Sequence, residues 1–236
     1  MEKICVVSGA DRGLGLGLCQ ELLEKGWKVF AGQYIVEWEE LSKLKEKYGE
    51  KLEIIPMDVS LVESLKKAFS MVKEKVDHVD ILISNAGIYG GRGDLREGID
   101  YKGARATYNV NALGPLRLVE TFLPLMEVGW RRICFVSSEV GSISMAYRDR
   151  DFGYSISKTG LNMAIKIMFN DLHPLGYTFR SYHPGWVRSY MSGSKSSNGD
   201  LEPIESAIPA IKLFTEARED EDRLVMMDYL SGEWPY

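Results

Sequence analysis

The sequence predicts an α/β protein in which one parallel sheet of about seven strands is covered by helices on both faces, a doubly wound arrangement. Two observations predict this class. Short apolar runs of strand length alternate with segments of helical periodicity along the whole chain. Glycine or polar residues then follow the strands, as expected where ligands bind beyond the carboxyl ends of parallel strands. No linker, fixed-period repeat or low-complexity tract interrupts the pattern, so residues 1–236 are expected to form one domain.

The strands and helices are placed by apolar periodicity and by turn residues. We expect strands at residues 4–8, 27–32, 52–57, 79–84, 132–137, 177–182 and 223–227. Helices are expected at about residues 14–26, 36–48, 61–76, 100–126, 154–173 and 203–217. Ser60 and Glu63 have the spacing of a capping box at the start of the third helix. Pro115 should bend or break the long fourth helix.

Two segments are expected to lie outside regular structure. Residues 89–98 are rich in glycine and charge and predict a surface loop, and residues 192–200 are rich in serine and glycine and predict a flexible one.

Composition restricts the function classes. The 236 residues are 45% hydrophobic and 27% charged, which is typical of a soluble globular protein. The net charge of −5, without a basic block, argues against a nucleic-acid partner. Three cysteines without ligand spacing and three scattered histidines predict no metal site, and the cysteines indicate a reducing compartment. We find neither a signal peptide nor an apolar run of membrane length, so we expect a cytoplasmic protein with no membrane partner.

A glycine-rich segment separates the first strand from the first helix. Its residues are Gly9, Ala10, Asp11, Arg12, Gly13, Leu14 and Gly15. A strand, such a loop and a helix together present backbone N–H groups at a helix amino end, where a phosphate is stabilised. This unit favours a Rossmann-type sheet that binds a nucleotide. The alternative is that the glycines only form a tight connection.

Tyr154 and Lys158 lie one helical turn apart on the same face of a predicted helix. The lysine charge can lower the pKa of the phenol from its usual value near 10. Bringing that pKa close to 7 would take roughly 4 kcal/mol, so a second cation or buried dipoles should contribute. The alternative is an ordinary amphipathic helix with a surface lysine.

Taken in order, these segments resemble the short-chain dehydrogenase/reductase family over essentially the whole chain. Ser8 to Gly15 is similar to the family's TGxxxGxG loop, with serine in place of threonine. Ser84-Asn85-Ala86-Gly87 is similar to its NNAG motif, with serine in place of the first asparagine. The other matching segments are Asp58-Val59, Asn111, Tyr154 with Lys158, and Pro184-Gly185-Trp186-Val187-Arg188-Ser189. The sequence around His183 to Val187 also resembles the carbonyl-reductase branch that includes the sniffer and CsgA proteins.

The candidate catalytic serine is chosen from two positions. Ser138 matches the second serine of the family's SSxxG pattern, since Glu139-Val140-Gly141 follows it. The family usually places this serine closer to the tyrosine, so residues 145–153 are expected to contain a short insertion. Ser142 is the alternative.

The resemblance implies hydride transfer between a nicotinamide cofactor and a carbonyl/alcohol pair. Tyr154 would be the general acid or base. Lys158 would lower its pKa and hold the ribose hydroxyls, Ser138 would donate a hydrogen bond to the substrate oxygen, and Asn111 would hold a water. The positions expected to bind the cofactor are Gly9, Asp11, Arg12, Gly13, Leu14, Gly15, Gln33, Tyr34, Asp58, Val59, Asn85, Ala86, Gly87, Tyr154, Lys158, Pro184, Gly185, Val187 and Ser189.

NADP is the expected cofactor, with NAD as the alternative. Arg12 can bind the adenosine 2′-phosphate through charge-assisted hydrogen bonds. The second strand runs into Gln33 and Tyr34, so no carboxylate there binds the ribose 2′-hydroxyl. The alternative for Arg12 is a solvated arginine paired with Asp11.

Two other functions fit the same fold. One is a catalytically silent NADP-binding regulator, although such proteins typically lose the tyrosine or lysine that this chain keeps. The other is the sugar-nucleotide epimerase branch, which has a larger carboxyl-terminal region.

The substrate and the assembly are expected only in outline. Loop residues that could line an apolar pocket for a carbonyl substrate, or could simply anchor loops, are Tyr89, Met145, Tyr147, Phe152, Trp186, Tyr190 and Met191. A homodimer or homotetramer is expected from the apolar helices around Asn111 and Tyr154.

Overall fold

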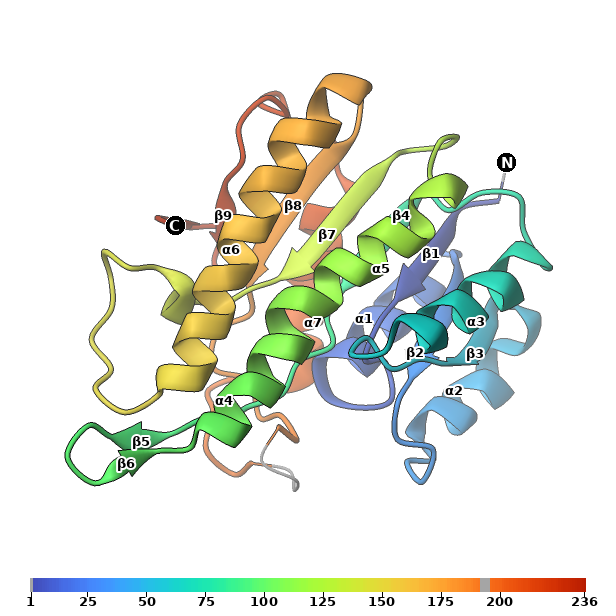
Figure 1. Ribbon diagram of the computed structural model, residues 1–236. Helices are drawn as coiled ribbons and strands as arrows, with labels where there is room; N and C mark the ends of the chain where they lie inside the picture. The colour runs from blue at the N-terminus through green and yellow to red at the C-terminus, as the bar shows by residue number, and fades with distance from the viewer. Residues whose placement is uncertain (1, 192–195) are drawn as a thin grey trace.

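The computed structural model describes residues 2–191 and 196–236 and is built around an eight-stranded sheet (Figure 1). The strand order is β10-β9-β8-β7-β4-β1-β2-β3, and every neighbouring pair is parallel except β9 and β10. The strands are β1 (Ile4–Val7), β2 (Lys28–Gln33), β3 (Leu52–Pro56), β4 (Ile81–Ser84), β7 (Arg132–Val136), β8 (Thr178–His183), β9 (Met226–Asp228) and β10 (Glu233–Trp234). The predicted fold class is confirmed. The added strand β10 is two residues long and too short for a periodicity signal.

Helices cover both faces of this sheet (Figure 1). On one face lie α1 (Gly13–Glu24), α2 (Glu40–Tyr48) and α7 (Pro203–Thr215). On the other lie α3 (Val62–Lys73), α5 (Gly114–Phe122) and α6 (Phe152–Leu172), with α4 (Tyr101–Tyr108) against α6. Alternate residues of one strand pack into different cores. Val6 of β1 packs on the face covered by α3, α5 and α6, and Val7 on the face covered by α1, α2 and α7. This explains why the strands are continuously apolar.

Shorter elements complete the described chain. The predicted surface loop at residues 89–98 contains most of a small hairpin, β5 (Gly93–Asp94) with β6 (Gly98–Ile99). Short 3₁₀ turns lie at Gly49–Lys51, Leu123–Leu125, Glu139–Gly141 and His173–Leu175. Residues 192–195 of the segment predicted to be flexible lie outside the described residues.

The long helix predicted at residues 100–126 is interrupted, as Pro115 predicts. A π-helical segment, Asn109–Leu113, separates α4 from α5. Pro115 has no N–H to donate to the carbonyl four residues earlier, and its ring collides with that carbonyl in a regular α-helix. That carbonyl belongs to Asn111, so the break falls at a candidate site residue. Single-turn π segments of this kind are frequent at functional sites.

The capping box predicted at Ser60 and Glu63 is wrong. Helix α3 begins at Val62 with Leu61 at its N-cap and no side-chain capping bond. The backbone N–H of Ser60 instead donates to Asp58 Oδ1 at 2.8 Å, which folds the turn after β3. A reciprocal capping box does occur at α7, between Glu202 and Glu205. Helix α2 also begins later than predicted, at Glu40.

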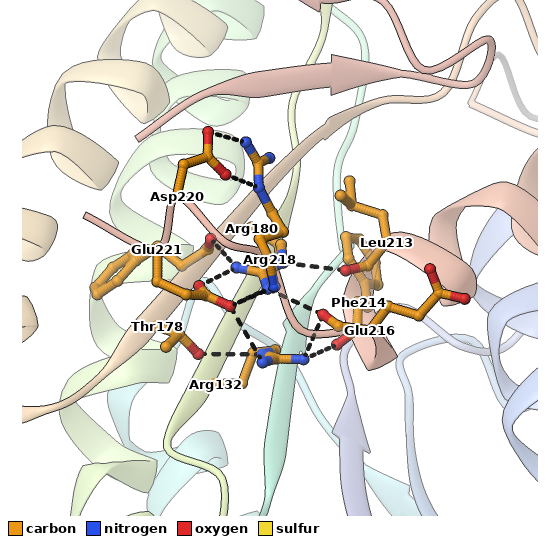
Figure 2. Close-up of polar contacts among 10 residues, drawn as sticks. Arg132, Thr178, Arg180, Leu213, Phe214, Glu216, Arg218, Asp220 and Glu221 are labelled. Carbon is orange, nitrogen blue, oxygen red and sulfur yellow. Dashed lines mark hydrogen bonds and ion pairs between the residues drawn. The ribbon is translucent and has the colours of Figure 1, made fainter. Parts of the chain in front are cut away.

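Two buried arginines bind the carboxyl end of α7 to the amino ends of β7 and β8. Figure 2 shows Arg132 and Arg180 converging on the last carbonyls of this helix. Arg180 also makes a bidentate pair with the Glu221 carboxylate, with both N···O distances 2.6 Å. The carbonyls that accept from the two guanidinium groups are those of Leu213, Phe214 and Glu216, together with that of Phe179. These bonds satisfy acceptors that a helix end leaves open and fix the segment leading to β9.

Glu221 is the negative charge of this cluster. Burial by itself would raise the pKa of its carboxyl, but the hydrogen bonds from Arg180 and the Arg218 backbone outweigh that effect and lower the pKa. Arg132 adds a charge at 3.6 Å. Since the carboxylate is favoured in the folded state, folding is stabilised wherever Glu221 is ionised.

We predict that Glu221→Gln lowers the free energy of unfolding at neutral pH by about 3 kcal/mol, because it leaves two buried guanidinium groups without an anion. The lowered pKa gives the sign of the pH dependence. The parent keeps this stabilisation above the unfolded pKa near 4.3 and loses it as pH falls through the lower folded value. Chemical denaturation along a descending pH series measures both effects. The exposed Glu219 of the same segment is the matched control, and equal losses in Glu221→Gln and Glu219→Gln would contradict the prediction.

Candidate active site

The candidate residues lie at one edge of the sheet, where the parallel strands end. Asn85 and Pro184 follow β4 and β8 directly. Gly9, Asp58 and Ser138 come two residues after the last residues of β1, β3 and β7. Because β1, β4, β7 and β8 are hydrogen-bonded neighbours, the residues after these strands lie close together in space.

The glycine loop is joined to the turn after β4. The Asn85 side-chain amide donates to the carbonyls of Ser8 and Gly9 at 3.0 and 2.9 Å. The Ser8 hydroxyl accepts from the backbone N–H groups of Asn85 and Ala86 at 3.0 and 3.2 Å, so the hydroxyl that replaces threonine has a defined role. A Cβ on Gly15 would lie 2.0 Å from the Gly9 carbonyl oxygen and 2.5 Å from Asn85 Nδ2. Only glycine permits this approach.

The start of α1 fits the pyrophosphate of a dinucleotide. No side chain caps this helix end, and its first turn holds no acidic residue. Gly13 has φ +57°, and a Cβ there would meet nothing closer than a Tyr190 ring carbon at 3.9 Å. The backbone N–H groups of Gly13, Leu14 and Gly15 therefore border an open cradle that an anion can enter.

Arg12 lies beside this cradle and has two neighbours. Its Nη1 is 3.2 Å from Asp11 Oδ2, and its guanidinium carbon is 5.1 Å from the centre of the Trp38 ring. Trp38 in turn packs edge-on against Tyr190, with ring centroids 4.7 Å apart. The strand β2 ends at Gln33, followed by the exposed Tyr34. The end of β2 therefore holds no carboxylate.

Asp58, Val59 and Gly87 border the same edge. The backbone N–H of Asp58 donates to Ser64 Oγ at 2.9 Å, and Val59 packs against Gly114 at the start of α5. Gly87 lies against the side chain of Asn111. Val59 and Gly87 therefore lie beside the π segment, and Asp58 is hydrogen-bonded to α3.

Asn111 and Lys158 are both buried. The Asn111 side chain accepts from Ile88 N–H at 2.9 Å and donates to the Ile88 carbonyl at 2.8 Å and to Ser157 Oγ at 3.0 Å. Lys158 Nζ donates to the Val136 carbonyl at 3.0 Å. Burial lowers the pKa of Lys158 to about 8.

The pKa of Tyr154 is raised in this structure and not lowered as predicted, and the contribution of Lys158 to it stays a prediction. Burial and, to a smaller extent, the negative charge of Glu139 raise the pKa of the Tyr154 phenol to about 12. The Ser138 side chain and the Arg148 charge act in the opposite direction without balancing these effects. Lys158 Nζ donates to a backbone carbonyl and lies 5.9 Å from the centre of the phenol ring.

Of the two candidate serines, Ser138 is the one that interacts with Tyr154. Its hydroxyl donates to Glu139 Oε2 at 2.6 Å. Ser142 is buried, and its hydroxyl lies 3.3 Å from that of Ser144. This arrangement favours Ser138 as the group beside the phenol.

The segment after β8 is held in place by contacts with α7 and with the chain after β9. The Pro184 carbonyl accepts from Ser206 Oγ at 2.8 Å, and Gly185, with φ +73°, lies over the Tyr229 ring. Val187 forms an isolated parallel bridge with Leu201, and the Ser189 N–H donates to the Val187 carbonyl. The predicted cofactor residues of this segment therefore lie between β8 and α7.

The aromatic residues expected around the substrate separate into different places. Tyr89 packs on Tyr154, with ring centroids 5.2 Å apart, and donates to Asp151. Tyr190 instead lies at the glycine loop against Trp38. Met145, Tyr147 and Trp186 are exposed, so an enclosed apolar pocket is not evident from them.

No cluster of metal ligands was found among the described residues, and none of their helices is long and apolar enough to cross a bilayer.

Comparison with known proteins agrees with this geometry. The family model described as short chain dehydrogenase matches residues 3–200. The chain belongs to this family. Membership makes it an NAD(P)-dependent oxidoreductase, as the sequence predicted.

Individual relatives cover nearly all of this short-chain dehydrogenase. An uncharacterised oxidoreductase of Schizosaccharomyces pombe is 34% identical over 98% of the chain and 92% of its own length. The NADPH-bound carbonyl reductase from chicken fatty liver has a TM-score of 0.87 at 26% identity, covering 100% and 99% of the two chains. The carbonyl reductase Sniffer of D. melanogaster has a TM-score of 0.89 at 25% identity, covering 100% of both.

Three residues near the site were missed by the sequence analysis. Glu139 contacts the candidate serine, Arg148 contacts Glu139, and Trp38 lies over Arg12. Glu139 could have been noticed as a charge directly after the serine pair. Arg148 and Trp38 are in irregular loops, where no periodicity predicts the direction of a side chain.

Proposed function

We propose that this short-chain dehydrogenase reduces a ketone or aldehyde with NADPH, and oxidises the corresponding alcohol in reverse, with Tyr154 as general acid and base. The observation that carries the proposal is the gathering of Tyr154, Ser138, Lys158 and Asn111 at the sheet edge that also holds the open glycine cradle. When bound, NADPH supplies the hydride for this chemistry.

Each of the four side chains has a separate role in the proposed reaction. The high pKa of Tyr154 keeps its hydroxyl protonated at neutral pH, so it can give a proton to the substrate oxygen during reduction. Ser138 donates a second hydrogen bond to that oxygen as it gains charge. Lys158 is mostly protonated at neutral pH because its pKa is about 8, and it brings a positive charge to the site. Asn111 fixes the π segment against Ile88 and Ser157, next to Lys158 in the sequence.

NADP as the cofactor is supported by the chemistry around Arg12. Its guanidinium lies over the Trp38 ring next to the glycine loop, and Gln33 and Tyr34 bring no carboxylate to repel a phosphate. The chicken carbonyl reductase of similar fold was solved with NADPH. The pair with the buried Asp11 joins one guanidinium nitrogen, Nη1, at 3.2 Å, so the planar guanidinium still has further N–H donors for a phosphate.

The assembly and the cellular location stay predictions. Helix α6 exposes Ile156, Met163 and Ile167, which supports a homodimer or homotetramer through this helix. The cytoplasmic location rests on the sequence alone.

The first prediction on activity concerns Tyr154→Phe. We expect kcat to fall by about 10²–10⁴-fold, because the ring still packs but the proton donor is lost. A panel of ketones and aldehydes with NADPH, followed by the loss of reduced-cofactor absorbance, measures it. NADPH affinity and thermal unfolding should match the parent. Turnover within about tenfold of the parent would remove Tyr154 from its role.

The second compares the two candidate serines. Ser138→Ala should lose about a hundredfold in kcat, the usual effect of removing an oxyanion donor. Ser142→Ala should keep kcat near that of the parent. The reverse pattern would assign the role to Ser142.

The third concerns cofactor choice. We expect the parent to prefer NADPH over NADH by about ten- to a hundredfold, and Arg12→Ala to lose most of this preference. The kcat/KM values for both cofactors measure it. Arg96→Ala is the matched control, because Arg96 also pairs with a nearby aspartate, Asp94, but in the β5–β6 hairpin. A parent that favours NADH, or an unchanged ratio in Arg12→Ala, would show that Arg12 does not bind the phosphate.

A further inference from the structure

The Ser138 hydroxyl has a single hydrogen, and it donates this hydrogen to Glu139 in a hydrogen bond. Ser138 Oγ donates to Glu139 Oε2 at 2.6 Å, a charge-assisted bond of the short kind. The oxygen also accepts from the Val140 N–H at 3.4 Å, so Ser138 caps the 3₁₀ turn Glu139–Gly141. In this arrangement the serine hydrogen is directed at Glu139, and the hydroxyl must turn to donate to the phenol or to the substrate.

Glu139 is a charged acceptor in this bond. Burial by itself would raise the pKa of its carboxyl, but Ser138, His183 and Arg148 together lower it. Arg148 Nη2 lies 2.9 Å from Glu139 Oε1, and His183 Nδ1 lies 3.8 Å from Oε2. Burial lowers the pKa of His183, which keeps that ring neutral at neutral pH. The positive charge that balances Glu139 is therefore Arg148.

A carboxylate at this position opposes carbonyl reduction in two ways. A carbonyl oxygen carries no hydrogen and gains negative charge as it reacts, so it needs donors around it. Glu139 competes with that oxygen for the Ser138 hydrogen. Its charge also disfavours negative charge on any oxygen nearby, including that of Tyr154.

We propose that Glu139 is a positioning residue that restrains this site: it holds the Ser138 hydroxyl as its own donor, and Arg148 sets the strength of the restraint by balancing its charge. This inference rests on the proposed function. Ser138 must turn from Glu139 to the substrate oxygen in each reduction, and the charge-assisted bond to Glu139 opposes that turn.

The charged groups around Tyr154 change the pKa of its phenol in opposite directions, and this difference can be measured. Glu139 and Tyr89 raise the pKa of the phenol, and Arg148 lowers it. Lys158 lies 5.9 Å from the phenol ring, and Asp151 binds both Tyr89 and Arg148. Removing the charge of Glu139 and removing that of Arg148 should therefore shift Tyr154 in opposite directions.

The first experiment measures reduction of 9,10-phenanthrenequinone by NADPH. Glu139→Gln keeps the shape of the side chain, and Glu139→Ala removes the acceptor altogether. We expect kcat/KM to rise by about tenfold in Glu139→Gln, because a neutral acceptor holds the serine less strongly. Glu139→Ala should rise at least as much, with the change mainly in kcat. A fall in kcat/KM in both variants would overturn the proposal.

The second experiment needs no turnover. Tyrosines labelled with ¹³C at Cζ are titrated by NMR, and the Tyr154 signal is identified by its loss in Tyr154→Phe. At the highest pH at which the parent stays folded, the ionised fraction of Tyr154 should be larger in Glu139→Gln and smaller in Arg148→Gln. Arg150→Gln is the matched control, since Arg150 belongs to the same loop but pairs with Asp94 at 3.6 Å.

The two experiments separate this inference from the proposed function. A parent that reduces no carbonyl compound of the panel contradicts the proposed function, and the titration still tests the charge arrangement. Shifts of the same sign in Glu139→Gln and Arg148→Gln, or no shift in either, would overturn the role of Glu139.

Discussion

The parallel pairing of β1 with β4 is the constraint on which the rest of the structure depends. It aligns Val7 with Ile83, so the two strands end at the same level and their following turns meet. The chain after β1 enters α1 on one face, and the helices near β4 cover the other face. Between two such turns an open sheet leaves the crevice in which ligands bind. The remaining candidate residues reach this crevice because β7 and β8 extend the same parallel order.

Local sequence then fixes the crevice in two places. Gly9 and Gly15 allow the first loop to approach Asn85 and Ala86 closely, and the amide of Asn85 holds the loop there. Pro115 has no N–H to donate to the carbonyl of Asn111, and the π segment results. In both places a residue with unusual backbone properties, glycine or proline, determines the conformation of its neighbours.

Two buried charge systems lie at opposite ends of the sheet and differ in how well they are satisfied. At the amino ends of β7 and β8, Arg132 and Arg180 donate to helix carbonyls and to Glu221, so the cluster serves stability. At the carboxyl ends, Glu139 has one arginine and one serine hydroxyl as close partners. In the proposed reaction the hydroxyl bonded to this carboxylate also binds the substrate, which would link stability to chemistry. Buried polar groups have large effects of this kind because the local dielectric is low.

The sequence by itself determined the fold class, the order of the motifs and the family, because apolar periodicity and the glycine, proline and turn residues act locally. It placed Tyr154, Lys158, Asn111 and Ser138 at the ends or on the helices of one sheet edge. Tertiary structure alone decided the electrostatics. The pKa of Tyr154 rises rather than falls because the phenol is buried and Glu139 lies near it. Such effects depend on burial and on the directions of side chains from separate loops, which no pattern along the chain encodes.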